Sequence, residues 1–232
     1  MRQVFLEKPW IYNKEPSEFA EIFVRYGRLE RYKRGATLAH GGKNGRIYYL
    51  SEGLVSCSSV DRNGQSFTFC LIPPERVFSE IDGISRTIVN VYVTAIRPST
   101  VYSLDFETWF KHLGSHQEDA LTLQVMQNLI GKFESHMEAM IANYTLPLSE
   151  RLRVFLKVLL TAYTDTISEW NEIPIYLSAQ EYAELMGASR VSISRLTSKW
   201  QKEMLLRKEG RSIFVRAALF DSIYDWVESN SR

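Results

Sequence analysis

Apolar and polar residues alternate over short distances between residues 28 and 105. β-Branched and aromatic residues are frequent in this segment, and turn signals such as "HGGKNG", "SEGL", "DRNGQ" and "IPPE" interrupt them at short intervals. This pattern is typical of short antiparallel strands. In "RNGQ", Asn63 and Gly64 can take the positive φ angles of a two-residue hairpin turn, and Gly53 is placed where "IYYL" must reverse. The segment therefore predicts an all-β domain.

The pattern changes near Leu123, where apolar residues begin to recur at alternating steps of four and three. The residues in this series are Met126, Ile130, Phe133, Met137, Met140 and Tyr144. Such spacing lines one narrow stripe of a long helix, and a stripe of this kind usually packs on another helix. We expect it to pair with the same helix of a second copy. The alternative is packing against the chain's own β-domain, because Gly131 and a length of only about three heptads weaken the pairing signal.

A break is predicted at Pro147, which lacks a donor N–H and disfavours helical angles in the residue before it. Beyond this hinge, "SERLRVFLKVLLTAY" predicts an amphipathic helix, "EIPIYL" a short strand and "SAQEYAELM" a second helix. Ser178 and Glu181 are spaced as a capping box at the start of the second helix, and Leu177 and Tyr182 are spaced as its hydrophobic staple.

The stretch "LMGASRVSISRLTSKW" continues this segment with helix-turn-helix spacing. Ala183 is small enough to let two helices approach, Gly187 supplies the turn, and Ile193 and Leu196 can bury the next helix against the previous one. In such motifs the second helix enters the major groove of DNA, and its N-terminal residues meet base edges. We therefore expect double-stranded DNA as the partner.

The residues expected to meet DNA follow from this placement. Ser189 is the expected N-cap, and "LLRKEGRSIFV" predicts a two-stranded wing whose basic residues, Arg207, Lys208, Arg211 and Arg216, can meet phosphates. The candidate DNA-binding residues are Ser189, Arg190, Val191, Ser194, Arg195, Lys199 and Arg211. Val191 has no acceptor and favours contact with a thymine methyl group. Arg195 can bind a base edge or a phosphate, and Arg190 a phosphate.

Composition and charge narrow the function class. The formal net charge is only +1 over 232 residues, so a nucleic-acid site must come from local clustering. Between residues 190 and 216, eight basic residues face two acidic ones, which supplies that cluster. The start "MRQVFLEKPW" has no signal-peptide core, and no run reaches membrane-spanning length. We therefore expect a cytoplasmic protein with no membrane association.

Other chemistries have little support in the sequence. Two cysteines, Cys57 and Cys70, cannot form a disulfide framework or a Cys-rich metal site, so neither a structural metal nor a cofactor is expected. We interpret them as inert core cysteines rather than a redox switch. An enzyme built on the β-domain would need clustered metal ligands, and only His40 lies there. A module that controls a protein partner is the third class, and the helix-turn-helix argues against it.

Together these segments resemble the family of the cyclic-AMP receptor protein and the fumarate–nitrate reduction regulator over nearly the whole chain. The resemblance is clearest in "GATLAHGGKNGRIYYLSEGLVS" and "LSAQEYAELMGASRVSISRL". It implies an α+β protein with a jelly-roll-like β-roll of the cyclic-nucleotide-binding type at residues 1–114, a dimerisation helix at 115–145 and a winged helix-turn-helix at 146–232. It also implies a parallel homodimer on an inverted repeat, allosteric control by a small ligand or redox signal, and contact with RNA polymerase.

Departures from that family bear on the effector. Its cyclic-AMP-binding members carry a Gly-Glu pair and then an Arg-Ser or Arg-Thr pair that holds the cyclic phosphate; here the corresponding pairs are Ser79-Glu80 and Val89-Asn90. A desolvated phosphate needs a cation or several aimed donors, and valine offers neither. We therefore do not expect a cyclic nucleotide. The N-terminus also lacks the cysteine cluster of the oxygen sensors, and no axial haem ligand is identifiable.

The segments "VNVYVTAIRPS" and "NLIGKFESHMEAMIANYTLPLSERLRVF" are similar to those of halophenol-responsive regulators of reductive dehalogenation. That resemblance places Lys132 against a phenolic oxygen, and an ammonium suits a phenolate. Leu129 and Cys70 stand where those regulators have tyrosines, and Glu80 where they have a lysine. The candidate effector-binding residues are Ser79, Glu80, Asn90, Tyr92, Leu129 and Lys132.

Plainer interpretations of two of these residues stay open: Lys132 as a solvated helix lysine, and Glu80 as a carboxylate satisfied by backbone amides. The halophenol-responsive regulators also carry valine at the position of Val191 and are associated with A/T-rich inverted repeats. The resemblance therefore implies a similar A/T-rich site, with half-sites about 10 base pairs apart if the dimer is parallel.

Overall fold

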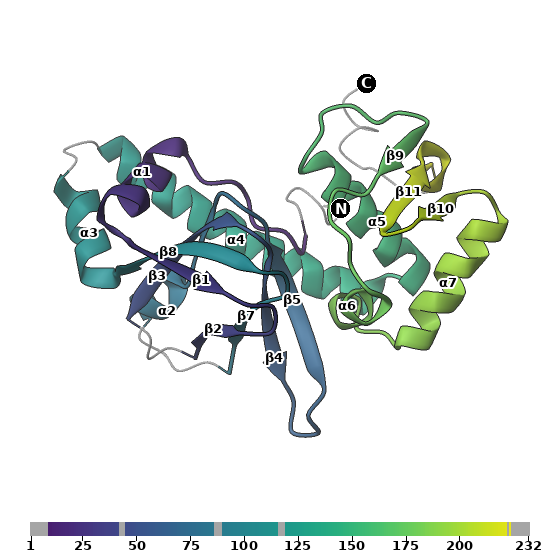
Figure 1. Ribbon diagram of the computed structural model, residues 1–232, viewed down its shortest axis with the longest axis horizontal. Coiled ribbons are helices and arrows are strands. Elements are labelled where there is room, and N and C mark those ends of the chain that lie inside the picture. The colour runs from purple at the N-terminus through teal and green to yellow at the C-terminus, as the bar shows by residue number, and fades with distance from the viewer. Residues whose placement is uncertain (1–8, 42–44, 86–89, 116–118, 222, 224–232) are drawn as a thin grey trace. The chain divides into compact units, whose positions relative to one another are not determined.

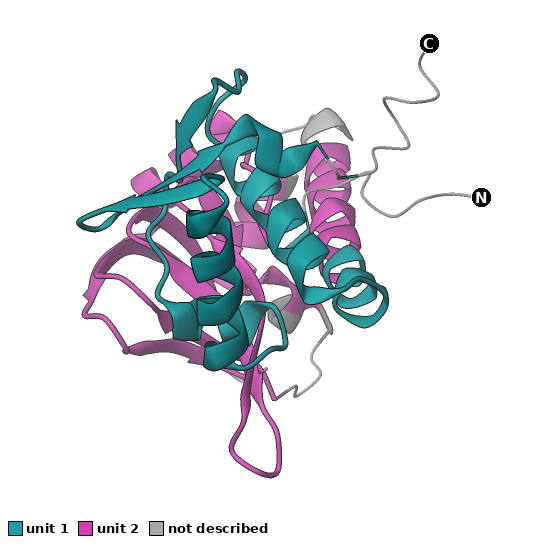
Figure 2. Cartoon of the chain, turned by 90° about the vertical axis from the view of Figure 1, so that its right-hand side faces the viewer, with its two compact units in different colours: residues 1–10, 137–232 teal, residues 11–136 magenta. Residues whose placement is uncertain are grey.

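The computed structural model describes residues 9–41, 45–85, 90–115, 119–221 and 223 (Figure 1). The chain divides into two compact units, one of residues 11–136 and the other of residues 1–10 together with 137–232 (Figure 2). The long helix α4 (Asp119–Thr145) contributes to both.

The unit of residues 11–136 is a β-roll made of two four-stranded antiparallel sheets (Figure 1). One sheet has the order β1-β8-β3-β6 and the other the order β2-β7-β4-β5. The strands are β1 (Arg28–Tyr32), β2 (Thr37–His40), β3 (Arg46–Glu52), β4 (Val55–Val60), β5 (Ser66–Ile72), β6 (Arg76–Phe78), β7 (Tyr92–Ala95) and β8 (Ser99–Asp105). The helices are α1 (Ser17–Tyr26), α2 (Glu80–Ser85), α3 (Phe106–Ser115) and the first part of α4. The predicted β-segment is confirmed, except that α2 interrupts it.

Two apolar clusters form the core of this unit. One includes Tyr48, Leu50 and Phe78 from one sheet and Val55 and Val93 from the other, all buried. In the second cluster, side chains of α1 and α3 pack on β3, β6 and β8. Burial of apolar side chains on both faces is the main driving force for this arrangement.

The link between β3 and β4 depends on Gly53. This residue has a φ of 100°, and a Cβ there would collide with the carbonyl oxygen of Pro98. The predicted reversal at Gly53 is confirmed, but it carries the chain from one sheet to the other, because β3 and β4 do not pair with each other.

The loop between β4 and β5 differs from the predicted two-residue turn. Asp61 and Gln65 are joined by a backbone hydrogen bond of 2.9 Å, so three residues form the loop, and Gly64 has a positive φ of 79° whereas Asn63 does not. The carboxylate of Asp61 accepts the N–H groups of Asn63 and Gln65, each at 2.8 Å. This side chain stabilises the longer loop, which ends in a left-handed glycine.

The unit that contains residues 137–232 has a helical core with a small three-stranded sheet of order β10-β11-β9. After the end of α4 its elements are α5 (Leu148–Thr161), β9 (Trp170–Glu172), α6 (Ala179–Leu185), α7 (Arg190–Lys202), β10 (Leu206–Glu209), β11 (Ser212–Arg216) and the 3-10 helix η1 (Ala217–Phe220). The predicted helix break at Pro147 is confirmed. The strand predicted over "EIPIYL" is wrong, since β9 ends at Glu172, before Pro174, which cannot donate to a sheet.

A charged group lies in the interior of the β-roll unit. Lys132 of α4 is 1% exposed, and its Nζ donates to Glu15 Oε1 at 2.5 Å, to Glu80 Oε1, and to the carbonyl oxygen of Val77 at 2.9 Å. Both carboxylates are buried as well. The interpretation of Lys132 as a solvated lysine is therefore wrong, and Glu80 is satisfied by the ammonium rather than by backbone amides.

Burial and the neighbouring charges shift the pKa values of Lys132 and Glu15. Burial lowers the pKa of Lys132, but the two facing carboxylates outweigh it and raise the pKa above its usual value. Burial raises the pKa of Glu15, the Lys132 ammonium opposes that rise, and the Glu80 charge adds to it, so the net direction is upward. The ammonium is thus fixed in its charged form between the two carboxyl groups.

Replacing Lys132 by alanine would leave two buried carboxyl groups without their cation. We expect Lys132→Ala to lower the free energy of unfolding by about 3–5 kcal/mol, as is typical when one partner of a buried ion pair is removed. Urea denaturation monitored by circular dichroism measures the change. The matched control is Lys199→Ala, which removes an exposed lysine 3.8 Å from Glu203 and should cost less than about 0.5 kcal/mol. Equal stability losses in the two variants would contradict the assignment.

Candidate DNA-binding and effector sites

Helix α6 begins at the predicted capping box. The side chain of Ser178 accepts the backbone N–H of Glu181 at 3.2 Å, and Glu181 Oε2 accepts the N–H of Ser178 at 2.7 Å. Leu177 and Tyr182, the predicted staple, are both buried. Two N–H groups that the helix leaves unpaired are satisfied in this way, so the start of α6 is fixed by local sequence.

The turn between α6 and α7 follows the predicted helix-turn-helix geometry. Gly187 has a φ of 54°, and the Oγ of Ser189 caps α7 by accepting the N–H of Ser192 at 3.1 Å. Ile193 and Trp200 of α7 are buried, as is Ala183 of α6. Leu196, which was predicted to be buried between the two helices, is half-buried. One face of α7 is therefore used for packing.

The opposite face of α7 is exposed. Arg190, Val191, Ser194 and Arg195 all lie on it, and 57% of Val191 is exposed although it is apolar. Ser189 is exposed too, but its hydroxyl is engaged in the cap and shares a hydrogen bond of 2.9 Å with Ser192. Four of the predicted residues thus share one accessible face at the helix N-terminus, the end that meets base edges in helix-turn-helix proteins.

Basic residues around this face fall into two groups. Arg207 stacks over the rings of Trp170 and Phe214, at 4.7 and 4.8 Å, and Arg216 Nη2 lies 2.6 Å from Glu169 Oε1. These two arginines, predicted to meet phosphates, are already engaged. Lys199 lies only 3.8 Å from Glu203, in an exposed pair.

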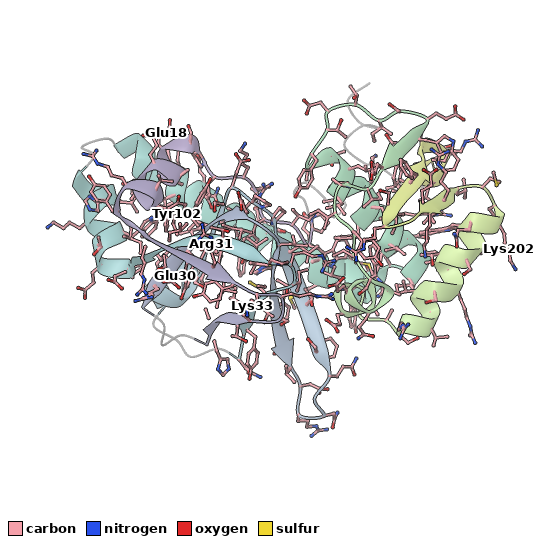
Figure 3. The ribbon with its side chains drawn as sticks, in the orientation of Figure 1. Glu18, Glu30, Arg31, Lys33, Tyr102 and Lys202 are labelled. Atoms are coloured by element: carbon pink, nitrogen blue, oxygen red, sulfur yellow. The ribbon has the colours of Figure 1, made fainter. Side chains whose placement is uncertain are left out.

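The second group comprises Arg190, Arg195, Lys202, Lys208 and Arg211, which are exposed and have no ion pair with any described residue. Figure 3 shows Lys202 on the outer side of α7. The predicted wing is present as the hairpin of β10 and β11, and Gly210 in its turn has a φ of 60°. The available positive charge therefore gathers on α7 and the wing.

The predicted apolar stripe lies along the exposed side of α4. Its six residues are 45–93% exposed: Met126, Ile130, Phe133, Met137, Met140 and Tyr144. Exposure contradicts the alternative that the stripe packs on the chain's own β-domain. Gly131, which weakened the helical pattern, faces the N-terminal segment, where a Cβ would come within 2.9 Å of Asn13 Nδ2. A stripe of large apolar residues in water is typical of an interface.

The predicted effector residues do not form one cluster. Glu80 and Lys132 are in direct contact, together with Glu15, which the sequence analysis missed. Asn90 instead donates to the carbonyl oxygen of Val60 at 3.0 Å, and the Tyr92 ring stacks on His40 with centroids 4.0 Å apart. Leu129 is half-buried on α4. Val89 lies outside the described residues.

Ser79 takes a backbone conformation that favours glycine. Its φ is 69°, and its buried hydroxyl has no hydrogen-bond partner among the described residues. The chain thus has a serine in a left-handed conformation that glycine adopts more easily, directly before Glu80.

A second buried polar group surrounds Cys70 and was also missed. Cys70 of β5 lies opposite Cys57 of β4 in the sheet, and His136 of α4 and Tyr12 approach it. Burial raises the pKa of the Cys70 thiol, but hydrogen bonds from Cys57, His136 and Tyr12 and the charge of His136 lower it to about 5. A sequence signal for the pair existed, because the two cysteines are equidistant from the Asn63-Gly64 turn.

Two structural properties bear on other function classes. Among the described residues, no helix is long and apolar enough to cross a membrane. In that same part of the chain, no group of three or more His, Cys, Asp or Glu side chains is arranged to hold a metal ion.

The chain matches two protein-family models. The model of the Crp-like helix-turn-helix domain matches residues 150–219, and that of the cyclic nucleotide-binding domain matches residues 29–116. Among curated proteins, the global nitrogen regulator of Synechococcus elongatus is 26% identical over 192 residues, which cover 81% of this chain and 85% of that protein.

Solved structures show the same fold. FixK2 from Bradyrhizobium japonicum superposes with a TM-score of 0.74 at 15% identity, covering 86% of this chain and 98% of FixK2. CprK in complex with OCPA gives a TM-score of 0.63 at 15% identity, covering 89% of this chain and 94% of CprK. With both family models matched, one in the β-roll and one over the helix-turn-helix, the chain belongs to the CRP/FNR family of DNA-binding transcription regulators.

Proposed function

We propose that this regulator acts as a homodimer that binds an A/T-rich inverted repeat through α7 and responds to a signal other than a cyclic nucleotide. The observation that carries the proposal is the exposed N-terminal face of α7, where Arg195 and Arg190 have no ion-pair partner among the described residues. RNA polymerase is the expected further partner, as the family resemblance implies.

Two features support the choice of operator. Val191 is exposed and offers only methyl groups, which suit the C5-methyl group of thymine and give cytosine N4 no acceptor. In a parallel dimer the two α7 helices enter successive major grooves, which sets the half-sites about 10 base pairs apart.

The signal is proposed to act inside the β-roll. A cyclic phosphate would need a free cation, whereas the ammonium of Lys132 is already held by Glu15 and Glu80. A halogenated phenolate is the second candidate and meets the same obstacle, because it would have to displace one of these carboxylates from Lys132. A chemical change in the buried side chains needs no such displacement, and we therefore favour it as the signal.

Dimerisation through the stripe of α4 can be tested by charge. Phe133→Glu and Met140→Glu each place a carboxylate opposite its own copy in a parallel pair, and like charges facing each other cost several kcal/mol. We expect the dimer dissociation constant to rise at least about tenfold in each variant. Sedimentation equilibrium measures it. Gln124→Glu, on an exposed position of α4 outside the stripe, is the control and should leave the dimer intact; monomers in all three variants would contradict the proposed interface.

DNA binding through α7 is tested by Arg195→Ala. Removing a base or phosphate contact of this kind costs about 1–3 kcal/mol, so we expect the dissociation constant to rise roughly 5- to 150-fold. Fluorescence anisotropy on an A/T-rich inverted repeat at fixed salt measures it. Lys33→Ala, an exposed lysine of the β-roll labelled in Figure 3, should bind like the wild type.

The same fluorescence anisotropy titration, repeated with cyclic AMP or a halogenated phenol, distinguishes the candidate signals. Cyclic AMP should leave the dissociation constant unchanged within about twofold, since the Lys132 ammonium is already held by Glu15 and Glu80. Tighter binding with cyclic AMP would contradict the proposal, and tighter binding with a halogenated phenol alone would favour the second candidate.

The role of Val191 predicts a change of specificity. Val191→Glu supplies an acceptor for cytosine N4, so we expect one position of each half-site to shift from an A·T to a G·C pair. Selection of binding sites from a randomised library reads this out, with Ser198→Ala, on an exposed position further along α7, as the control. An unchanged preference would remove Val191 from the base-reading residues.

A further inference from the structure

Cys57 and Cys70 are placed to react with each other. They are direct partners in the antiparallel pairing of β4 and β5, so their side chains lie on the same face of the sheet, and both are buried as reduced thiols. Directly opposed residues have Cα atoms about 4.5–5.5 Å apart, within the range of about 4.4–6.8 Å that a disulfide spans. The register shifts immediately after Cys57, and such bulges often adjoin functional sites.

Polar groups beside Cys70 favour its thiolate form. Burial raises the pKa of the Cys70 thiol, whereas Cys57, His136 with its charge, and Tyr12 lower it. His136 also packs on Tyr12, with ring centroids 5.3 Å apart, and its Nε2 has no hydrogen-bond partner among the described residues. Neighbours that lower the pKa of a thiol stabilise its anion, which is the nucleophile in thiol chemistry.

We propose that Cys70 is a peroxide-reactive thiolate and that Cys57 resolves its oxidised form into an intramolecular disulfide. The Cys70 sulfur attacks one oxygen of hydrogen peroxide, the O–O bond breaks, and the hydroxide that leaves takes up a proton to become water. The Cys57 sulfur then attacks the resulting sulfenic acid, the S–O bond breaks, its proton is lost, and a second water leaves. Two thiols are oxidised by two electrons, and one peroxide is reduced to two waters.

Oxidation of the cysteine pair would be the signal that the proposed function requires. Its effect on DNA binding rests on that proposed function. Burial lowers the pKa of His136, as does the charge of Lys132, but Cys70 as an anion raises it, and the net direction is upward. Conversion of the thiolate into a neutral disulfide removes the upward influence, so His136 loses its proton more readily. Because His136 lies on α4, between Phe133 and Met137 of the exposed stripe, the change reaches the helix that carries the proposed dimer interface.

Mass spectrometry of the full chain tests the chemistry, because these are its only two cysteines. Reduced protein is treated with hydrogen peroxide, alkylated with N-ethylmaleimide under denaturing conditions and weighed intact. We expect the monomer to lose two hydrogens and take up no maleimide, and dithiothreitol to restore two adducts. Two maleimide adducts after peroxide treatment, or a disulfide that joins two chains, would overturn the proposal.

Single variants assign the roles. In Cys57→Ser, the Cys70 sulfenic acid should persist and be trapped by dimedone. In Cys70→Ser, the matched control, we expect Cys57 to react at least about tenfold more slowly than Cys70 does, because the charge of His136 acts on the Cys70 sulfur. Equal reactivity of the two cysteines would contradict the assignment.

The pH dependence of the wild type gives a readout that needs no variant. The titratable groups that act on Cys70 are Cys57 of β4, His136 of α4 and Tyr12. Lys132 of α4 acts in turn on His136, and Glu80 of α2 acts on Tyr12. With its pKa near 5, Cys70 should react at an almost constant rate from pH 8 down to about pH 6. A rate that falls about tenfold per pH unit over this range, as for an ordinary thiol, would overturn the proposal.

Fluorescence anisotropy on the inverted repeat, measured for reduced and for oxidised protein, distinguishes failure of the thiol chemistry from failure of the proposed DNA-binding function. A difference of at least fivefold in DNA affinity between the forms supports both. DNA binding by reduced protein that forms no disulfide overturns this inference and leaves the proposed function standing. A disulfide without DNA binding by either form supports the thiol chemistry and overturns the proposed function.

Discussion

The burial of Lys132 is the constraint on which the β-roll unit depends. An ammonium in an apolar interior is tolerated only when opposite charges and hydrogen-bond acceptors replace its water. Glu15, Glu80 and the carbonyl oxygen of Val77 do this here, and they come from the segment before α1, from α2 and from β6. Three parts of the roll are thereby tied to one point on α4, and none of them can move away from the lysine without leaving a charge unpaired.

This constraint gives the two sides of α4 different roles. Lys132 and Ser135 face the interior, where Ser135 donates to the carbonyl oxygen of Ile11 at 3.3 Å, whereas Phe133 is 58% exposed. A single helix therefore carries buried polar groups on one side and the apolar stripe on the other. Any change of charge among the buried groups acts on a helix whose outer side is free to contact a second chain.

The parts of the structure that the sequence predicted are those set by local spacing. The capping box of Ser178 and Glu181, the turn at Gly187 and the cap at Ser189 each involve residues within a few positions of one another, so their geometry follows from the order of residue types. Two local features were nevertheless missed: β9 ends before Pro174, and the carboxylate of Asp61 stabilises a three-residue loop between β4 and β5.

The buried clusters could not be predicted in the same way. Glu15 and Lys132 are 117 residues apart in the chain, and nothing in their local sequence indicates that they meet. Cys57 and Cys70 could be paired from their distances to the turn, but the approach of His136 required the position of α4. Pairings of this kind depend on tertiary packing, which residue spacing does not encode.

The turn at Ser79 bears on whether the neighbouring carboxylate of Glu80 is available to a ligand. A serine at a φ of 69° bears a cost that glycine would avoid, yet the chain keeps this backbone next to Glu80. Glu80, beside this turn, is directed to Lys132 of the same unit. An internal ion pair thus occupies the carboxylate beside the turn, so the charges in this part of the roll are satisfied from within.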